Sequence, residues 1–301
     1  MKQFLFKLVL FLSFIIIIDL IIGVTSDILR RNAKGGSTAN NYYIAEECKD
    51  DIIILGSSRA SHHYIPEILE TSLGLSCYNC GEEGNGIILG YGRYKMITDH
   101  HIPKIIIYEV TPEYDWTIGD NSQFTRYLKP YCHNPAIYDL VTNVSDSKER
   151  FKLLSQMYRN NSSFVTYIVD NLIYRDNAKG YSPMWGTMKE PIEERIDTVN
   201  SIIDEQKIFL LEEMIKDSHY NGIELLFVVS PYYWRSKTQE KYAPIIDLCE
   251  KYDVDFLDFR NIEGITENLE AFNDAGHMNH IGAIQYTEFI SKFLQTSMYL
   301  N

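Results

Sequence analysis

Few features of the sequence point to a bound cofactor or metal. It has neither a glycine-rich dinucleotide fingerprint nor a phosphate-binding P-loop, which argues against dehydrogenases and kinases. The 5 cysteines include one Cys-x-x-Cys pair, Cys77 and Cys80, which is too few ligands for a zinc ribbon. This pair falls in an expected strand, where residues three apart lie ~10 Å from each other, beyond the reach of a disulfide. We expect both to be small core residues, and we expect no cofactor and no metal.

Clusters of lysine and arginine are also absent. The chain has 28 Lys and Arg against 41 Asp and Glu, a formal net charge of −13, so nucleic acid is not an expected partner because its phosphates would be repelled. The 22 tyrosines suit a surface that binds glycans or acyl groups, but tyrosine also commonly fills sheets and half-buried faces.

Only one apolar run is long enough to span a bilayer. It extends over residues 8–24, follows Lys2 and Lys7, and is interrupted by Ser13 and Asp19. It indicates a secretory signal or a membrane anchor. Asp19 argues against deep insertion, because a carboxylate costs ~3 kcal/mol at the centre of a membrane helix. The cleavage signal around 24–26 is poor, so we favour an uncleaved, single-pass anchor.

The remaining sequence suggests three segments. Residues 1–26 form the anchor or signal segment, residues 27–46 a polar linker, and residues 47–301 an α/β domain with a helical insertion at about 112–190. The basic residues Arg30, Arg31 and Lys34 follow the apolar run, so the positive-inside count does not support an N-terminus in the cytoplasm.

Short apolar runs alternate with helical patterns along the domain. Strands are expected at 51–55, 76–80, 104–110, 223–230 and 254–258. Helices are expected at 65–73, 87–98, 192–218, 239–252 and 282–296, with helical periodicity in the insertion at 148–158 and 164–174. This alternation predicts a three-layer α/β/α, flavodoxin-like sandwich around a central parallel sheet of about five strands.

Polar candidates follow the expected strands in turn. Ser58 follows the first strand, Gly84 the second, Glu113 the third and Tyr232 the fourth, and Asp274 and His277 precede the last helix. Because functional groups of open α/β sheets gather at the carboxyl ends of the strands, all these residues are expected at one edge.

Two of these motifs supply the parts of a nucleophilic esterase. Gly56-Ser57-Ser58-Arg59 places serines at a strand end, and Asp274-Ala275-Gly276-His277 places a carboxylate three residues before a histidine. A serine hydroxyl is a weak nucleophile until a base takes its proton, and a carboxylate orients that base.

Together with 79–84 and 279–283, these motifs resemble the SGNH (GDSL-like) hydrolase and acyltransferase superfamily over roughly residues 51–296. The resemblance implies that Ser58 is the nucleophile, His277 the base and Asp274 its partner. It also implies that the backbone amides of Ser58 and Gly84 form an oxyanion hole. The Gly-Ser-Ser-Arg variant with a membrane segment resembles bacterial envelope members that handle acylated glycans or cell-wall polymers. This analogy places the catalytic domain outside the cytoplasm, at the cell membrane.

The third motif of that superfamily is missing. An asparagine expected after the third strand is replaced by the run Glu109-Val110-Thr111-Pro112-Glu113. Losing one oxyanion donor costs ~10²–10³ in rate. Asn85 or Arg59 is a candidate to compensate.

Several residues have a second interpretation. Ser57 is a competing nucleophile, and Arg59 either binds an anionic substrate group or pairs with a glutamate. Residues 231–234, including Tyr232, form either an aromatic sugar platform or a packed loop. The remaining charged and imidazole groups are expected to be solvated, capping or peripheral to the site: Glu82, Glu83, Glu109, Glu113, His62, His63, His100, His101 and His280.

The expected function is a serine esterase acting on acyl, especially acetyl, esters of envelope or extracellular glycans. The substrate partner is an acylated glycan or a small ester. An O-acyltransferase on polysaccharide and a non-catalytic glycan-binding protein remain as alternatives, and the missing asparagine favours the latter. A membrane-tethered scaffold that uses the tyrosine-rich insertion is a further possibility without a positive motif.

Overall fold

The computed structural model describes residues 1–161, 163–191, 202–233 and 240–297. The chain forms two compact units. Unit 1 consists of Met1–Ala45 and Asn121–Asn177, and unit 2 consists of Glu46–Asp120 and Ala178–Asn301. The candidate residues all belong to unit 2.

The centre of unit 2 is a parallel sheet of five strands in the order β2-β1-β3-β4-β5. This is the flavodoxin-like order, as predicted. The strands are β1 (Ile52–Gly56), β2 (Cys77–Asn79), β3 (Ile105–Glu109), β4 (Glu224–Val229) and β5 (Asp255–Asp258). Strands β1 and β3 are buried along their whole length, which explains their unbroken apolar sequences.

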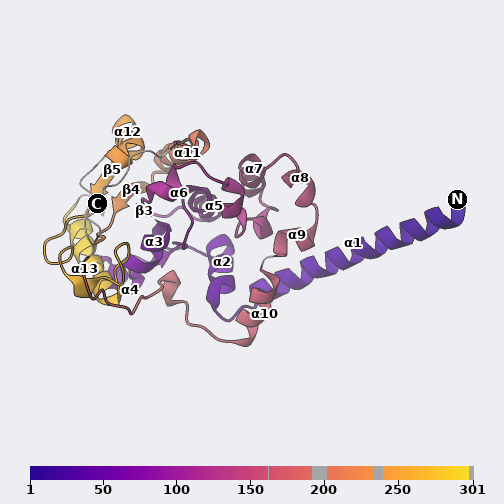
Figure 1. Cartoon of the computed structure of the whole chain (residues 1–301), viewed down its shortest axis with the longest axis horizontal. Helices are drawn as coiled ribbons and strands as arrows, with labels where there is room; N and C mark the ends of the chain where they lie inside the picture. Colours follow the sequence, from indigo (N-terminus) through magenta and orange to yellow (C-terminus); the bar gives the residue numbers. More distant parts are fainter. Residues whose placement is uncertain (162, 192–201, 234–239, 298–301) are drawn as a thin grey trace. The chain divides into compact units, whose positions relative to one another are not determined.

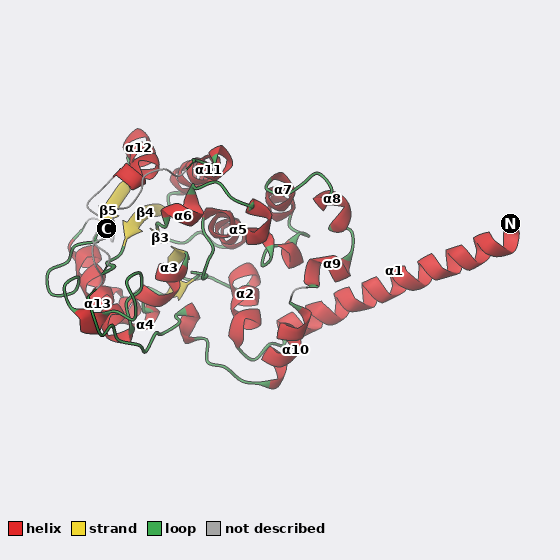
Figure 2. Cartoon of the chain, in the orientation of Figure 1, coloured by secondary structure: helices red, strands yellow, loops and turns green. Residues whose placement is uncertain are grey.

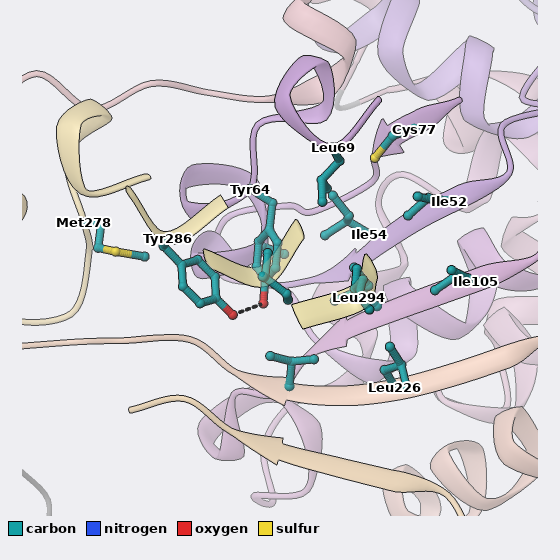
Figure 3. Close-up of a cluster of buried hydrophobic side chains, with 14 of the residues drawn as sticks. Ile52, Ile54, Tyr64, Leu69, Cys77, Ile105, Leu226, Met278, Tyr286 and Leu294 are labelled. Atoms are coloured by element: carbon teal, nitrogen blue, oxygen red, sulfur yellow. Dashed lines mark hydrogen bonds between the residues drawn. The ribbon is translucent and has the colours of Figure 1, made fainter. Parts of the chain in front are cut away.

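Helices cover both faces of the sheet (Figures 1 and 2). On one face, α4 (Pro66–Leu73) and α13 (His280–Thr296) pack on alternate residues of β1, β3 and β4. Figure 3 shows this cluster, in which Tyr286 and Leu294 of α13 meet Ile54 and Leu226 of the sheet. Each fully buried side chain of this kind contributes about 1.5–3 kcal/mol.

The opposite face carries α5 (Ile87–Thr98), which packs against α11 (Glu205–Asn221). A Cβ at Gly90 of α5 would lie 3.0 Å from the ring of Tyr108, so α5 approaches the side of β3 opposite to α13. The remaining α-helices among the described residues of unit 2 are α3 (Ser58–His63), α6 (Pro112–Asp115) and α12 (Ala243–Tyr252), and short 3-10 helices lie at Ala178–Gly180, Glu240–Tyr242 and Leu269–Ala271. The three predicted layers are therefore confirmed.

Two sequence-based expectations for local structure were wrong. Residues 202–204 of the expected helix 192–218 are not helical, and α11 begins after Asp204, whose side chain accepts from the N–H groups of Gln206 and Lys207. Residues 192–201 lie outside the described residues. Part of the expected linker forms the helix α2 (Gly36–Glu46). In addition, Ser58, after the turn that ends β1, begins the short helix α3, which was not expected.

Unit 1 is helical. Its described residues form the α-helices α1 (Lys2–Arg31), α2, α7 (Pro135–Asn143), α8 (Glu149–Lys152), α9 (Gln156–Asn160) and α10 (Phe164–Leu172), and 3-10 helices at Asn121–Thr125 and Lys129–Tyr131. The predicted helicity of 148–158 appears as two short helices, α8 and α9, instead of one. Among the residues that the structure describes, α1 is the one helix long and apolar enough to cross a membrane.

Candidate active site

Three side chains of unit 2 form a chain of hydrogen bonds. Ser58 Oγ lies 2.8 Å from Nε2 of His277, and Nδ1 of His277 lies 2.9 Å and 3.1 Å from the two carboxylate oxygens of Asp274. These contacts join α3 to the loop before α13, although the serine and the histidine are far apart in the sequence. The structure thus brings together the serine, the imidazole and the carboxylate that the motifs singled out.

The position of Ser58 follows from the tight turn at the end of β1. Gly56 has φ +134°, and a Cβ there would lie 2.5 Å from the carbonyl oxygen of Glu109. Only glycine allows this approach. Ser58 is the first residue of α3, so its backbone N–H has no acceptor within the helix.

The histidine loop is shaped by Asp274 itself. Its Oδ1 accepts from the backbone N–H of Gly276 at 2.8 Å and of His277 at 3.0 Å. Downstream, Asn279 caps α13 by accepting from Ile281 and Gly282. The carboxylate therefore holds both the backbone and the ring of His277.

Electrostatics determine which imidazole nitrogen carries the proton. Burial raises the pKa of Asp274, but hydrogen bonds from His277 and Gly276 outweigh it and lower that pKa to about 2. The ionised carboxylate can only accept, so Nδ1 of neutral His277 carries the proton. Nε2 is then an acceptor for the Ser58 hydroxyl, which is the arrangement that general-base catalysis requires.

A buried network lies behind this loop. The backbone N–H of Met278 donates to Nε2 of His63 at 2.9 Å, and Nδ1 of His63 lies 2.7 Å from Ser230 Oγ. Ser230 Oγ in turn donates to Glu109 at 2.9 Å. Because Met278 donates to Nε2, Nδ1 must carry the proton of neutral His63. Burial lowers the pKa of His63 well below its ordinary value, with smaller effects of His277 and Arg59.

Glu109 is fully buried, which corrects the expectation of a solvated loop charge. Its carboxylate lies 3.2 Å from Nε of Arg59 and also accepts from Tyr64 and from the backbone N–H of Ser230. Burial raises the pKa of Glu109, and Arg59 opposes that rise. The pair ties together the ends of β1, β3 and β4.

Arg59 therefore follows the second of its two interpretations. It is buried, pairs with Glu109, and donates to the carbonyl oxygen of Val110. The ring of Tyr232 covers its guanidinium with a centroid distance of 5.1 Å. Tyr232 is itself buried, which supports the packed-loop interpretation. Trp234, the last aromatic residue of that proposed platform, lies outside the described residues.

The loop after β2 packs beside α3. Glu82 N–H donates to the carbonyl oxygen of Gly56 at 3.1 Å, which brings this loop alongside the turn before Ser58. Gly84 is exposed, with φ +66°, and the side chain of Asn85 donates to the carbonyl oxygen of Glu83 at 2.8 Å. The hydrogen bond from Glu82 thus holds the loop against the end of β1, two residues before Ser58.

Asp115 anchors the far end of the same loop. Its carboxylate accepts from Tyr108 and from the N–H of Thr111, each at 2.6 Å, and from the N–H of Ile87 at the start of α5. Burial raises the pKa of Asp115 to about 7 despite these hydrogen bonds. The sequence analysis missed this residue, because a lone aspartate after Pro112 carries no motif.

Residues 178–188 form a segment that packs against α3 and the start of α13, and the sequence analysis did not identify it. Ser182 N–H donates to the carbonyl oxygen of Ser61 at 2.9 Å, and His280 N–H donates to that of Met184 at 2.7 Å. The exposed ring of Trp185 lies 4.7 Å from the ring of His280. Nδ1 of His280 is hydrogen-bonded to the hydroxyl of Tyr181, so the side chain of His280 packs against this segment.

Other expected solvated groups have partners within unit 2. His62 is buried, with Nε2 2.8 Å from Glu83 and Nδ1 2.6 Å from the Ser182 carbonyl oxygen. Glu82 pairs with Arg93 at 2.7 Å, whereas Glu113 is exposed as expected. His100 and His101 form hydrogen bonds with the backbone carbonyl oxygens of Cys48 and Asp50, respectively.

All five cysteines are buried and none forms a disulfide. No group of three or more potential metal ligands occurs among the described residues.

Comparisons with known proteins give structural similarities only. No family model and no curated protein matches the sequence. Among solved structures, the chain is similar to the psychrotrophic esterase EstA from Pseudoalteromonas sp., with 10% identity and a TM-score of 0.40 over 82% of this chain and 100% of that one. It is similar to an acetyl xylan esterase, AlAXEase, with 12% identity and a TM-score of 0.39 over 82% and 99%. A proposed acylhydrolase from Bacteroides fragilis NCTC 9343 has 10% identity and a TM-score of 0.43 over 88% and 98%. Similarity at this level carries no conclusion about activity, so the candidate function rests on the side chains.

Replacing Glu109 should destabilise unit 2 strongly. Glu109→Ala leaves the buried guanidinium of Arg59 without its counter-charge, which costs about 3–5 kcal/mol. The measurement is guanidinium chloride unfolding of the full chain in detergent. Glu113→Ala is the matched control, since it removes an exposed glutamate and should change the unfolding free energy by no more than about 0.5 kcal/mol. Equal effects of the two variants would contradict the role assigned to Glu109.

Asp115 should make stability depend on pH. Its folded pKa of about 7 lies above the ordinary value of 3.8, so the folded state binds the proton more tightly. Its stabilising contribution is complete below pH ~4 and is lost as pH rises to ~7, with a slope of at most about 1.4 kcal/mol per pH unit. Asp115→Asn should flatten this part of the unfolding profile, whereas Asp99→Asn, at an exposed position, should not. A variant profile parallel to that of the parent chain would contradict the assignment.

Proposed function

We propose that the protein is a membrane-anchored serine esterase of the SGNH type, acting on acyl esters, especially acetyl esters, of envelope or extracellular glycans. The observation that supports this most directly is the hydrogen bond of 2.8 Å between Ser58 Oγ and Nε2 of His277, with Asp274 on the other ring nitrogen. The distance lies within the range that general-base activation requires.

In the proposed reaction, Ser58 Oγ attacks the ester carbonyl carbon while Nε2 of His277 takes the hydroxyl proton. Asp274 stabilises the imidazolium that results. The backbone N–H groups of Ser58 and Gly84 hold the negative oxygen of the tetrahedral intermediate. His277 then gives the proton to the leaving sugar oxygen as the ester bond breaks. Water, activated by His277, hydrolyses the acyl-enzyme and releases the carboxylic acid.

The oxyanion hole of this proposal consists of backbone donors. Both side chains considered as replacements for the missing asparagine have partners within the fold: Asn85 bonds to Glu83, and Arg59 is held by Glu109. With one donor fewer, a rate ~10²–10³ below that of an enzyme with the full set is expected. Transfer of the acyl group to a sugar hydroxyl instead of water uses the same residues.

Retention of α1 as a single-pass anchor, with unit 2 outside the cytoplasm, belongs to the same proposal. Asp19, in the middle of the apolar segment, accepts from Ser155 Oγ at 2.6 Å and from the N–H groups of Gln156 and Met157 at 2.8 Å and 2.9 Å. It thereby caps the N-terminus of α9. Cleavage near residues 24–26 would remove this cap from unit 1.

The nucleophile is tested by labelling with a fluorophosphonate. The parent chain should be labelled covalently, and Ser58→Ala should lose labelling together with p-nitrophenyl acetate hydrolysis, by about 10³-fold or more. Ser57→Ala is the matched control, because it alters the neighbouring hydroxyl and should retain labelling. Persistent labelling of Ser58→Ala would refute the assignment, and glycan binding without turnover by the parent chain would favour a non-catalytic role.

The anchor is tested by the intact mass of the protein purified from membranes. A retained α1 gives a mass close to the 35.0 kDa of the full chain. A shorter chain that begins near residue 26 would show that the segment is a cleaved signal. Protease added to the outside of intact cells should degrade unit 2, and protection of unit 2 would contradict the orientation.

A further inference from the structure

An apolar edge of unit 1 lies exposed beside the anchor. Phe151 of α8 is 76% exposed, Leu154 between α8 and α9 is 74% exposed, and Met157 of α9 is 45% exposed. The adjoining residues Ser155, Gln156 and Met157 are those that bind Asp19 of α1. Figure 1 shows α9 beside α1, with α8 on the other side of α9. The edge is therefore attached to the middle of the apolar helix.

The length of α1 indicates where this edge lies along the membrane normal. The helix residues before Asp19, from Lys2 to Ile18, extend ~26 Å at 1.5 Å per residue. A bilayer's hydrocarbon core is ~30 Å thick. A span that begins at Lys2 places the turn that contains Asp19 at the border of the hydrocarbon. The helix α9, which Asp19 caps, must then lie at the same border.

The exposed apolar surface of α1 continues on the C-terminal side of Asp19. Ile21, Val24 and Ile28 are exposed at helical spacing, while Gly23 packs closely on Gln156. In α10, Val165, Ile168 and Leu172 are exposed at spacings of three and four, and the other face of α10 buries Tyr167 and Asp170. Such an amphipathic arrangement is typical of helices that lie in a membrane interface.

The two units carry formal net charges of opposite sign. Unit 1 has 12 Lys and Arg against 7 Asp and Glu, a formal net charge of +5, although the whole chain carries −13. The remainder of the chain therefore carries −18. Arg150 and Lys152 flank Phe151 in the sequence. Basic residues beside an exposed apolar edge suit a surface of anionic lipid headgroups.

We propose that unit 1 is embedded in the membrane surface. Phe151, Leu154 and Met157 insert into the leaflet beside Asp19. The occupant of this face is the bilayer, because the face is continuous with the surface of the helix that crosses it. The contact rests on the proposed role of α1 as a membrane-spanning helix, and it holds whether or not Ser58 is catalytic.

The test places an environment-sensitive fluorophore at single introduced cysteines in the full chain. Leu154→Cys and Phe151→Cys are the probes, and Tyr220→Cys of α11, 89% exposed, is the matched control. The five native cysteines are buried, and the labelled parent chain gives the background. The proteins are reconstituted at a low protein-to-lipid ratio in phosphatidylcholine and phosphatidylglycerol vesicles, with and without lipids that carry a nitroxide on the acyl chain.

Labels at positions 151 and 154 should show blue-shifted emission and lose most of it to the nitroxide lipids, whereas the label at position 220 should do neither. Emission at 151 and 154 equal to that at 220, without quenching, would overturn the proposal. A blue shift that nitroxide lipids do not quench, and that grows with the protein-to-lipid ratio, would show a second copy on this face and also overturn it. Both probe positions are exposed, so neither substitution removes a core side chain.

Discussion

The ion pair between Arg59 and Glu109 holds together the strand ends that carry the candidate site. Arg59 belongs to the helix that begins with Ser58, and Glu109 is the last residue of β3. The same carboxylate binds Ser230 directly after β4, and through Ser230 and His63 it reaches the backbone of the histidine loop at Met278. A buried ion pair adds little net stability compared with apolar residues of similar size, but removal of one partner lowers the free energy of unfolding strongly. It therefore favours one mutual arrangement of the serine and histidine segments over others.

The sheet and the local geometry of the histidine loop were predictable from sequence, because both depend on short-range patterns. Unbroken runs such as 52–55 and 105–107 indicate strands buried on both faces. The spacing from Asp274 to His277 lets one carboxylate bind both the backbone and the ring of the histidine. The meeting of Ser58 and His277 was predicted only by adding a superfamily resemblance to the rule about strand ends.

What the sequence did not indicate depends on contacts between distant residues. Glu109 reads as a solvated charge because its partners Tyr64, Arg59 and Ser230 come from other elements. The six residues of α3 are too few to show a periodicity, and the segment that forms α2 is polar although Thr38 is buried against Asp170. The break between α8 and α9 occurs at Ser155, which binds Asp19 more than a hundred residues earlier. No local propensity reports such partners.

Asp19 also sets the angular register of α1. Its carboxylate meets α9 from one side of α1, and Asn171 binds the Leu29 carbonyl oxygen at 2.7 Å from the same unit. Between these two contacts the helix can neither slide nor rotate. One residue added there would turn the distal part by about 100° and shift it by ~1.5 Å, so that the two contacts no longer fit together. One residue added before Asp19 leaves both contacts in place, so the fit of α1 to unit 1 depends on the length of the helix on only one side of this carboxylate.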